Sequence, residues 1–417
     1  MSRPVILVAV GHYLPGFRAG GALRSIANLV DHLADEFDFR ILTSDRDLGE
    51  DRAYAGVVTE RWVPVGPALV HYTPPGKQGA GAIVRAIRDL PHDLLYLNSA
   101  FSPRFAILPL AARRLGLVPR RPTVLAPRGE FAGGALAIKA FKKRGYLAAA
   151  RLGGLFGDVR WQASSPFEAE DIRAVIGARA GVATASDLTA RLADRPPAHA
   201  PRAPGAPLRV LFLGRISPMK NLDFRAARAG TGAQRGGVRH LRPARGRGLP
   251  ASVPAGGGGG AGPCERALAG ACAAGGGRRA DGAIRPVFFL PSRGENFGHV
   301  IAESLAAGTP VLISDTTPWR GLAAAGVGDD LPLSDPAAFA ARIEALAAEP
   351  AEAALARRAR AAAHVRQAQR QAGDLMANRN LFRAALGRAV AGGGGVLTFG
   401  EVRVRGEGQG HAGRTRF

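Results

Sequence analysis

Cysteine is nearly absent from this sequence, and long hydrophobic runs are absent altogether. The 417 residues include two Cys, Cys264 and Cys272, so a disulfide framework and a Cys-based metal site are excluded over the rest of the chain. No apolar run reaches the ~18–20 residues that a membrane-spanning helix needs. Residues 1–10 lack the apolar length and cleavage site of a signal peptide, so we expect a cytoplasmic protein that opens with a β-strand.

Acidic residues are also scarce, because 56 Lys and Arg face 33 Asp and Glu and leave a net charge of +23. Such an excess ordinarily favours nucleic acid or an anionic membrane as a partner. However, residues 225–287 hold eleven Arg against one Glu and one Asp, and residues 388–417 hold five Arg against two Glu. These two stretches supply about half of the net charge, so it is a local property, and we expect no nucleic-acid partner.

The first 195 residues alternate short apolar segments with helical patterns. β-rich segments lie at 5–10, 39–44, 93–98 and 122–127. Between the first two, Ile26, Leu29, Val30 and Leu33 recur at helical spacing on one face. Continuous apolar strands that alternate with helices predict an α/β domain with a parallel, doubly wound sheet over residues 1–195.

A second α/β domain is expected over residues 208–386, after a Pro- and Ala-rich linker at 196–207. Its strands are predicted at 208–216, 287–292 and 310–315. A helical region follows over 335–366, in which Asp335 is the N-cap and Pro336 the first helical residue. Residues 387–417 read as a basic, Gly-rich tail.

Residues 225–287 do not resemble the rest of the chain. They hold seventeen Gly and almost no β-branched or aromatic residue, a composition that cannot bury enough apolar surface to fold. If each codon of 238–249, 264–277 and 280–286 is read one base late, all three segments can give ordinary protein sequence. We therefore hypothesise an inserted base near Phe224 and a compensating change near Val287. A disordered insertion and a basic module for RNA or acidic polymers are the alternatives.

The strongest motif is RGENFGHVIAESLAAGTPVLIS at 293–314. Glu295 lies in a Gly-containing loop after a strand, and Glu303 lies about two turns into the following helix. Such a junction aims the backbone N–H groups of Asn296, Phe297 and Gly298 at an anionic ligand. Two carboxylates at this spacing can accept hydroxyl hydrogen bonds from two parts of one ligand, although solvated acids at a helix start are the alternative.

This segment resembles the E-x7-E signature of the large retaining group 1 family of glycosyltransferases. The resemblance implies the GT-B fold, in which two Rossmann-like domains face each other across a cleft, here with the second interrupted by the Arg/Gly-rich stretch. It also implies that Glu295 faces the sugar of a nucleoside-diphosphate sugar and that Glu303 bonds the ribose. The donor is then a substrate, and no cofactor or metal is expected.

Two further motifs fit this resemblance. FLGRISPMKNLDF at 212–224 is similar to the family's G-R-x-x-x-x-K-N/G pattern, which implies that Arg215 and Lys220 bind the donor diphosphate. Gly20 and Gly21 precede an amphipathic helix, where glycine lets backbone approach a ligand closely. The resemblance implies that this loop faces the donor from the other domain, although an ordinary glycine turn is the alternative.

Weaker similarities link APRGEF at 126–131, KAFKKR at 139–144 and ASSPFEAEDI at 163–172 to the subgroup that builds exopolysaccharide or lipopolysaccharide. Arg128 is a candidate contact for donor or acceptor. The run with Lys139, Lys142, Lys143 and Arg144 is a candidate for peripheral contact with an anionic inner membrane face, against the alternative of a solvated helix face. Asn98 stands where many family members have His, and His299 is expected to form local hydrogen bonds.

The sequence thus predicts an enzyme that moves a sugar from a nucleoside-diphosphate donor to a glycan or lipid-linked acceptor in cell-surface polysaccharide synthesis. Glu295, Arg215 and Lys220 are the expected catalytic residues. The expected donor-binding residues are Gly20, Gly21, Asn296, Phe297, Gly298 and Glu303. An inactive, frameshifted relative and a basic nucleic-acid-binding protein are the competing interpretations.

Overall fold

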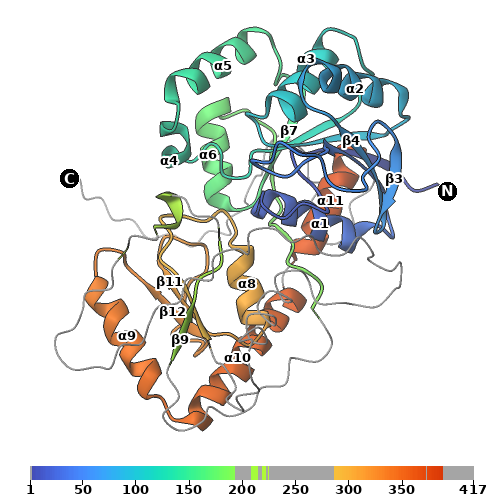
Figure 1. The fold of residues 1–417 in the computed structure, drawn as a ribbon. Coiled ribbons are helices and arrows are strands. Elements are labelled where there is room, and N and C mark those ends of the chain that lie inside the picture. Colours follow the sequence, from blue (N-terminus) through green and yellow to red (C-terminus); the bar gives the residue numbers. More distant parts are fainter. Residues whose placement is uncertain are drawn as a thin grey trace, which may run out of the picture.

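The computed structural model describes residues 2–192, 208–214, 218–221, 224, 286–371 and 373–387. The expected linker at 196–207, the stretch 225–287 except for its last two residues, the tail beyond residue 387, and Arg215 lie outside these ranges. Figure 1 shows two lobes stacked one on the other. We call residues 2–192 the first lobe and residues 208–371 the second lobe.

The first lobe is built on an eight-stranded sheet with the strand order β3-β4-β2-β1-β5-β6-β7-β8. All neighbours are parallel except β3 and β4. The strands are β1 (Val5–Ala9), β2 (Asp38–Ser44), β3 (Trp62–Val65), β4 (Ala68–Thr73), β5 (Leu94–Asn98), β6 (Thr123–Ala126), β7 (Val159–Ala163) and β8 (Val182–Thr184). The strands predicted from the four apolar segments are confirmed as β1, β2, β5 and β6.

Helices cover both faces of this sheet, as a doubly wound fold requires. They are α1 (Gly21–Leu33), α2 (Gly76–Asp89), α3 (Leu108–Arg114), α4 (Gly133–Ala137), α5 (Ala140–Leu152) and α6 (Pro166–Ile176), with a π-helical turn, η1 (Pro103–Ile107), before α3. Along β1, Ile6 and Val8 join the core beneath α1, whereas Leu7 and Ala9 join the core on the opposite face. Because both faces are buried, the strands read as continuous apolar runs.

The second lobe has a parallel sheet of four strands in its described part, in the order β12-β11-β10-β9. They are β9 (Arg209–Leu211), β10 (Pro286–Leu290), β11 (Val311–Ser314) and β12 (Gly328–Leu331). A 3-10 turn, η2 (Pro218–Lys220), follows β9. Residues of α8 (His299–Ala306) and α10 (Ala351–Gln371) join the core on one face of the sheet, and residues of α9 (Pro336–Ala348) join the core on the other.

The helical region expected over 335–366 is divided into two helices. Asp335 caps α9 as predicted, because its side chain accepts a hydrogen bond from the Ala338 N–H at 3.0 Å. The predicted helical region is confirmed, but it is interrupted, since α9 ends at Ala348 and Glu349 is extended before Pro350. Proline has no N–H to continue a helix, and it disfavours the helical conformation in the residue before it.

The chain returns to the first lobe through α11 (Asp374–Ala385). Figure 1 shows this red helix beside α1, within the otherwise blue lobe. Its Phe382 meets the rings of Phe37 and Tyr96 edge-on, at centroid distances of 5.5 and 5.3 Å. The last described helix therefore completes the core of the lobe in which the chain began.

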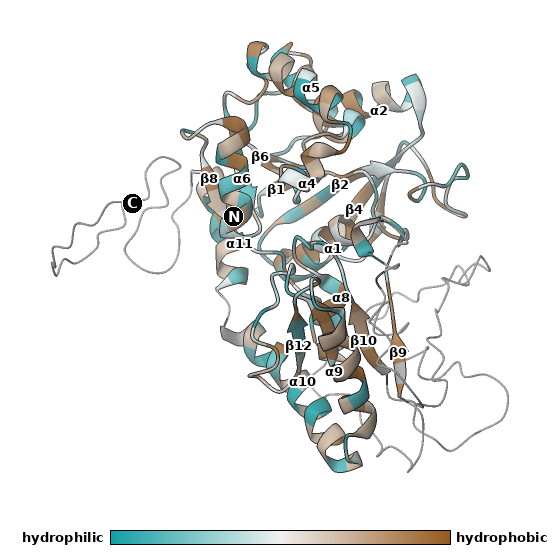
Figure 2. Ribbon diagram, turned by 90° about the vertical axis from the view of Figure 1, so that its left-hand side faces the viewer, coloured by the Kyte–Doolittle hydropathy of each residue, from teal (hydrophilic) through white to brown (hydrophobic). Residues whose placement is uncertain are grey.

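Hydrophobic residues concentrate inside the lobes. Figure 2 shows brown strands β9 and β10 in the second lobe, whereas α10 mixes polar and apolar residues along its length. Among the helices in the described part of the chain, none is long and apolar enough to cross a bilayer.

Candidate donor-binding site

The loop between β10 and α8 is fixed by its backbone conformation and by one tryptophan. Gly298, the N-cap of α8, has φ +83°, a region that favours glycine, and a Cβ there would lie 2.9 Å from Ile301 Cδ1. Trp319 donates a hydrogen bond from Nε1 to the Phe297 carbonyl at 2.7 Å. The segment 296–298 is therefore held at the N-terminus of α8, where the helix dipole favours an anion.

Glu295, which lies in this loop, forms an ion pair with Lys220 of η2. The Lys220 ammonium donates to Glu295 Oε1, and both side chains are largely buried. Lys220 reaches the loop because η2 sits beside it, where the Arg293 N–H donates to the Met219 carbonyl at 2.8 Å. The structure thus brings together two residues that the sequence placed 75 positions apart.

Glu303 faces the first lobe from within α8. Its nearest cation is Arg24 of α1, with 3.9 Å between Arg24 Nε and Glu303 Oε1. The other oxygen, Oε2, is buried and has no hydrogen-bond partner among the described residues. Buried carboxylate oxygens normally have partners, so this atom marks a place where a ligand hydroxyl can bind.

Gly20 and Gly21 lie opposite Glu303, at the N-terminus of α1. Gly20 has φ +71° and is the N-cap of the helix. A Cβ on Gly21 would lie 4.0 Å from Cδ2 of His299, the first residue of α8. The N-termini of two helices, one from each lobe, therefore approach each other at the candidate site.

Asn296 also contacts the first lobe. Its Oδ1 accepts a hydrogen bond from the Ser164 hydroxyl at 3.1 Å. A Cβ on Gly129, which has φ +79°, would come within 3.2 Å of the same oxygen. The loop after β6 and the Glu295 loop are thus in van der Waals contact, so the second lobe's motif is seated directly on the first lobe.

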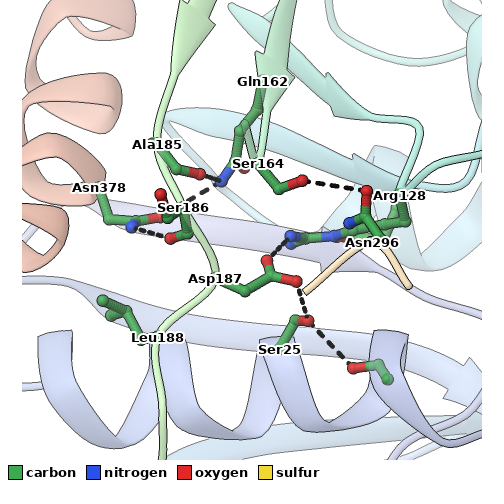
Figure 3. A network of polar contacts seen from close by, with 12 residues as sticks. Ser25, Arg128, Gln162, Ser164, Ala185, Ser186, Asp187, Leu188, Asn296 and Asn378 are labelled. Carbon is green, nitrogen blue, oxygen red and sulfur yellow. Dashed lines mark hydrogen bonds and ion pairs between the residues drawn. The ribbon is translucent and has the colours of Figure 1, made fainter. Parts of the chain in front are cut away.

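A polar network that the sequence analysis missed lies beside these loops, and Figure 3 shows it. Asp187 pairs with Arg128, and the Ser25 hydroxyl donates to Asp187 Oδ2 at 2.7 Å. Ser25 Oγ is also 3.0 Å from His299 Nε2, so His299 forms a hydrogen bond as expected, but with a residue of the first lobe and not with a local partner. Ser25, Asp187 and Arg24 stand in no motif that singles them out.

The candidate site therefore gathers Gly20, Gly21, Lys220, Glu295, Asn296, Phe297, Gly298 and Glu303 along one border between the lobes. Arg215 lies outside the described residues, so its place in this site stays a prediction. Facing helix N-termini, a lysine and two carboxylates suit a ligand that carries both phosphate and hydroxyl groups.

Comparison with solved structures identifies the same fold. Sucrose-phosphate synthase from Thermosynechococcus elongatus aligns with 93% of this chain and 100% of its own, at 14% identity and a TM-score of 0.53. HepE from Anabaena, in complex with UDP and glucose, aligns with 92% of this chain and 99% of its own, also at 14% identity and a TM-score of 0.53. WaaG, a glycosyltransferase involved in lipopolysaccharide biosynthesis, aligns over 93% and 100% at 12% identity and a TM-score of 0.50.

These likenesses define the fold as that of the GT-B glycosyltransferases. Residues 283–365 match the family model described as "Glycosyl transferases group 1", a segment that contains Glu295, Glu303 and the whole of α8. No curated protein matches the sequence. The family match and the fold together support a glycosyltransferase enzyme.

Proposed function

We propose that this protein transfers a sugar from a nucleoside-diphosphate donor to a glycan or lipid-linked acceptor during cell-surface polysaccharide synthesis. The observation that carries the proposal is the unpartnered Glu303 Oε2, which is buried where α8 meets α1. A ribose hydroxyl would satisfy this oxygen. Retention of the anomeric configuration is part of the proposal and follows from the resemblance of the E-x7-E motif.

Each part of the donor has a matching group on the chain. Lys220 would bind the diphosphate as a point charge, together with Arg215. To do so it would either break its ion pair with Glu295 or contact Glu295 and the phosphate at once. Glu295 would then accept a hydrogen bond from a hydroxyl group of the sugar. The N-termini of α1 and α8 would supply backbone N–H groups and favourable dipoles to the phosphates. In this scheme the second lobe binds the donor together with the Gly20–Gly21 loop, and the rest of residues 1–195 supplies the acceptor side.

These groups would accelerate transfer through electrostatics and positioning. As the bond between the sugar and the diphosphate breaks, negative charge grows on the leaving phosphate and positive charge on the anomeric carbon. Lys220 and the helix N-termini would stabilise the phosphate, and the Glu295 carboxylate would stabilise the sugar. The two lobes would hold donor and acceptor together, which reduces the entropic part of the barrier.

Two of the structural neighbours support this choice of substrates. HepE was solved in complex with UDP-glucose, which supports a nucleotide-sugar donor here. WaaG acts in lipopolysaccharide biosynthesis, which supports a cell-surface glycan as the acceptor. The donor and acceptor panel of the following test identifies the sugar, the base and the acceptor.

The test is release of nucleoside diphosphate from a panel of UDP-, GDP- and ADP-sugars, measured with and without lipopolysaccharide or membrane glycolipid. Two forms of the protein are compared: the chain as written, and a form in which the reading frame over residues 225–287 is restored. We expect turnover by the restored form and little or none by the chain as written. Robust turnover by the chain as written would disprove the expected loss of activity, and no turnover by either form would disprove the transferase proposal.

The physical reason for this difference lies at the edge of the second sheet. β10 is flanked by β9 and β11, so the Glu295 loop has neighbours on both sides. β9 has one strand neighbour in the described part of the chain, and it precedes η2, which carries Lys220. Residues 225–287, as written, lack the apolar side chains from which further strands could be built.

We also propose that α4 and α5 contact an anionic membrane surface. Phe141 and Leu152 are each 91% exposed and Ile138 is 59% exposed, although side chains of this size are usually buried. Residues 131–157 contain five Lys or Arg and no acidic residue. Between the two helices lies a cavity of about 320 Å³, lined by apolar residues such as Leu136 and Leu147 and by Lys143 and Arg144.

Of the four cations expected on this surface, three are exposed. Lys143 instead turns inward, donates to the Ala135 carbonyl at 2.7 Å and lies over the Phe101 ring at 4.8 Å. The test is co-sedimentation with phosphatidylcholine vesicles, with and without phosphatidylglycerol. We expect binding only with phosphatidylglycerol, a loss in the variant Phe141→Ala/Lys142→Ala, and no loss in the control Leu117→Ala, which removes an exposed leucine elsewhere in the first lobe. Equal binding by both variants would disprove this contact.

A further inference from the structure

One carboxylate touches three segments that are far apart in the sequence. Asp187 lies just beyond β8, on the part of the chain that leaves the first lobe. Its Oδ1 accepts from Arg128, in the loop after β6, and its Oδ2 accepts from Ser25, in the first turns of α1. Oδ2 is also 3.8 Å from Nε2 of His299, the first residue of α8.

This cluster is buried at the border between the lobes. Asp187, Ser25 and His299 are each less than 10% exposed. Burial raises the pKa of Asp187, but the Arg128 charge and the contacts with His299 and Ser25 outweigh it and hold that pKa at about 2. Asp187 is therefore ionised at neutral pH and remains an acceptor. Because a buried carboxylate without partners is costly, these contacts are maintained together.

The geometry excludes a nucleophilic triad. Ser25 Oγ and the Asp187 carboxylate both face the same ring nitrogen, Nε2 of His299, at 3.0 and 3.8 Å. A triad requires the acid and the nucleophile to face opposite nitrogens of the ring. The Gly21 carbonyl lies 3.0 Å from Ser25 Oγ and is a second, longer acceptor for the single hydroxyl proton. The cluster thus fixes positions and does not activate the serine.

Arg128 shows how tightly this arrangement is specified. Its φ of +58° lies in the left-handed region, which costs a residue with a side chain ~1 kcal/mol. It also donates to Asn98 Oδ1 and to the Tyr96 hydroxyl. Arg128 thereby orients the Asp187 carboxylate toward Ser25.

We propose that Asp187 is a positioning residue that holds the two lobes in the donor-binding arrangement by directing Ser25 onto His299. Ser25 follows Gly20 and Gly21, and His299 follows the Glu295 loop, so one carboxylate aligns the two segments that face the donor. This inference rests on the proposed function, because it assigns the aligned segments to donor binding.

The test measures the distance between the lobes in the full-length chain as written, and the affinity for UDP in the frame-restored form. Cys264 and Cys272 are replaced by Ser, and spin labels are attached to Cys introduced at exposed Leu117 in the first lobe and Glu344 in the second. The variants are Asp187→Asn and Ser25→Ala. The control is Asp329→Asn, which breaks a buried ion pair with Arg342 inside the second lobe.

We expect Asp187→Asn and Ser25→Ala to broaden the distance distribution and to weaken UDP binding about tenfold, the scale of a lost hydrogen bond to a charged group. The control should leave both quantities unchanged. Ser25→Ala keeps the pair of Arg128 and Asp187, so it decides the question if Asp187→Asn fails to fold. Unchanged distances in the folded variants would overturn the inference. Failure of the frame-restored parent to bind UDP would exclude a uridine donor and leave the transferase proposal to the donor panel, while the distances would still decide whether Asp187 holds the lobes.

Discussion

The two lobes differ in how much of their own core they supply. The first lobe has eight strands with a large core on each face, yet one of those cores includes Leu381, Phe382 and Ala385 from the end of the described chain. The second lobe carries the most specific motifs on four described strands, with smaller cores. The lobe that is easier to recognise by its motifs is therefore the one with less packing to hold those motifs in place.

This contrast predicts that different parts of the molecule govern stability and donor binding. Packing in the first lobe and α11 should dominate the free energy of unfolding, whereas loop contacts in the second lobe should dominate donor binding. Matched pairs of substitutions test whether stability and donor binding are governed by different lobes in this way.

Phe382→Ala should cost the first lobe about 3–5 kcal/mol of unfolding free energy, because it empties a buried site lined by Phe37, Phe39 and Tyr96. Urea denaturation gives the total, and hydrogen exchange assigns the loss to a lobe. Phe141→Ala removes the same side chain from an exposed position and should change stability by less than about 0.5 kcal/mol. A loss of protection confined to the second lobe would contradict this prediction.

In the frame-restored form, Lys220→Ala, Glu295→Ala and Glu303→Ala should each lower kcat/KM at least ~10²-fold, the scale of one preorganised electrostatic contact. Their unfolding free energies should change far less than that of Phe382→Ala. Lys142→Ala removes an exposed lysine of α5 and serves as the control for charge. A rate near that of the parent in any of the three would remove that residue from the site.

Acid should weaken the contact between the lobes through Asp187. Its folded pKa of about 2 lies below the ordinary value of 3.8, so its stabilising contribution is complete above pH 3.8 and is lost as the pH falls toward 2. The shift corresponds to about 2 kcal/mol. Denaturation midpoints measured across this window should fall more steeply in the parent than in Asp187→Asn. Parallel curves would show that Asp187 does not titrate in this range.

Two helix N-caps, one in each lobe, provide the most closely matched pair of substitutions and the smallest expected losses of unfolding free energy. Ser165 caps α6 in the first lobe by accepting from the Glu168 N–H at 3.1 Å, and Asp335 caps α9 in the second. Ser165→Ala and Asp335→Ala should each cost about 1 kcal/mol. Hydrogen exchange should place each loss in its own lobe. Loss in both lobes from either variant would mean that the lobes unfold as one unit.

Four of the eight strands of the first sheet, β1, β2, β5 and β6, were predicted from the sequence, because strands buried on both faces read as uninterrupted apolar runs. β7 was harder to recognise since it carries Gln162, which is buried because its amide bonds Tyr96, Ala185 and Asn378. The division between α9 and α10 could have been predicted, because Pro350 marks it in the sequence.

The residues of the candidate site also divide into those that the sequence predicted and those that it did not. Glu295, Glu303 and Lys220 were found because they belong to motifs with fixed spacing. Asp187 was not, since its importance comes from Ser25, 162 residues earlier, and from His299 in the other lobe. No local pattern distinguishes a carboxylate that closes a buried network from one that faces water.

The return of α11 to the first lobe also has a consequence for synthesis on the ribosome. Phe37, Phe39 and Tyr96 are translated early, but Phe382, which packs against them, follows some 280 residues after Tyr96. Until then the nascent first lobe exposes an aromatic patch that chaperones can bind. A shift of the reading frame that was never compensated would leave this patch uncovered. An error within the second lobe would then also leave the core of the first lobe incomplete.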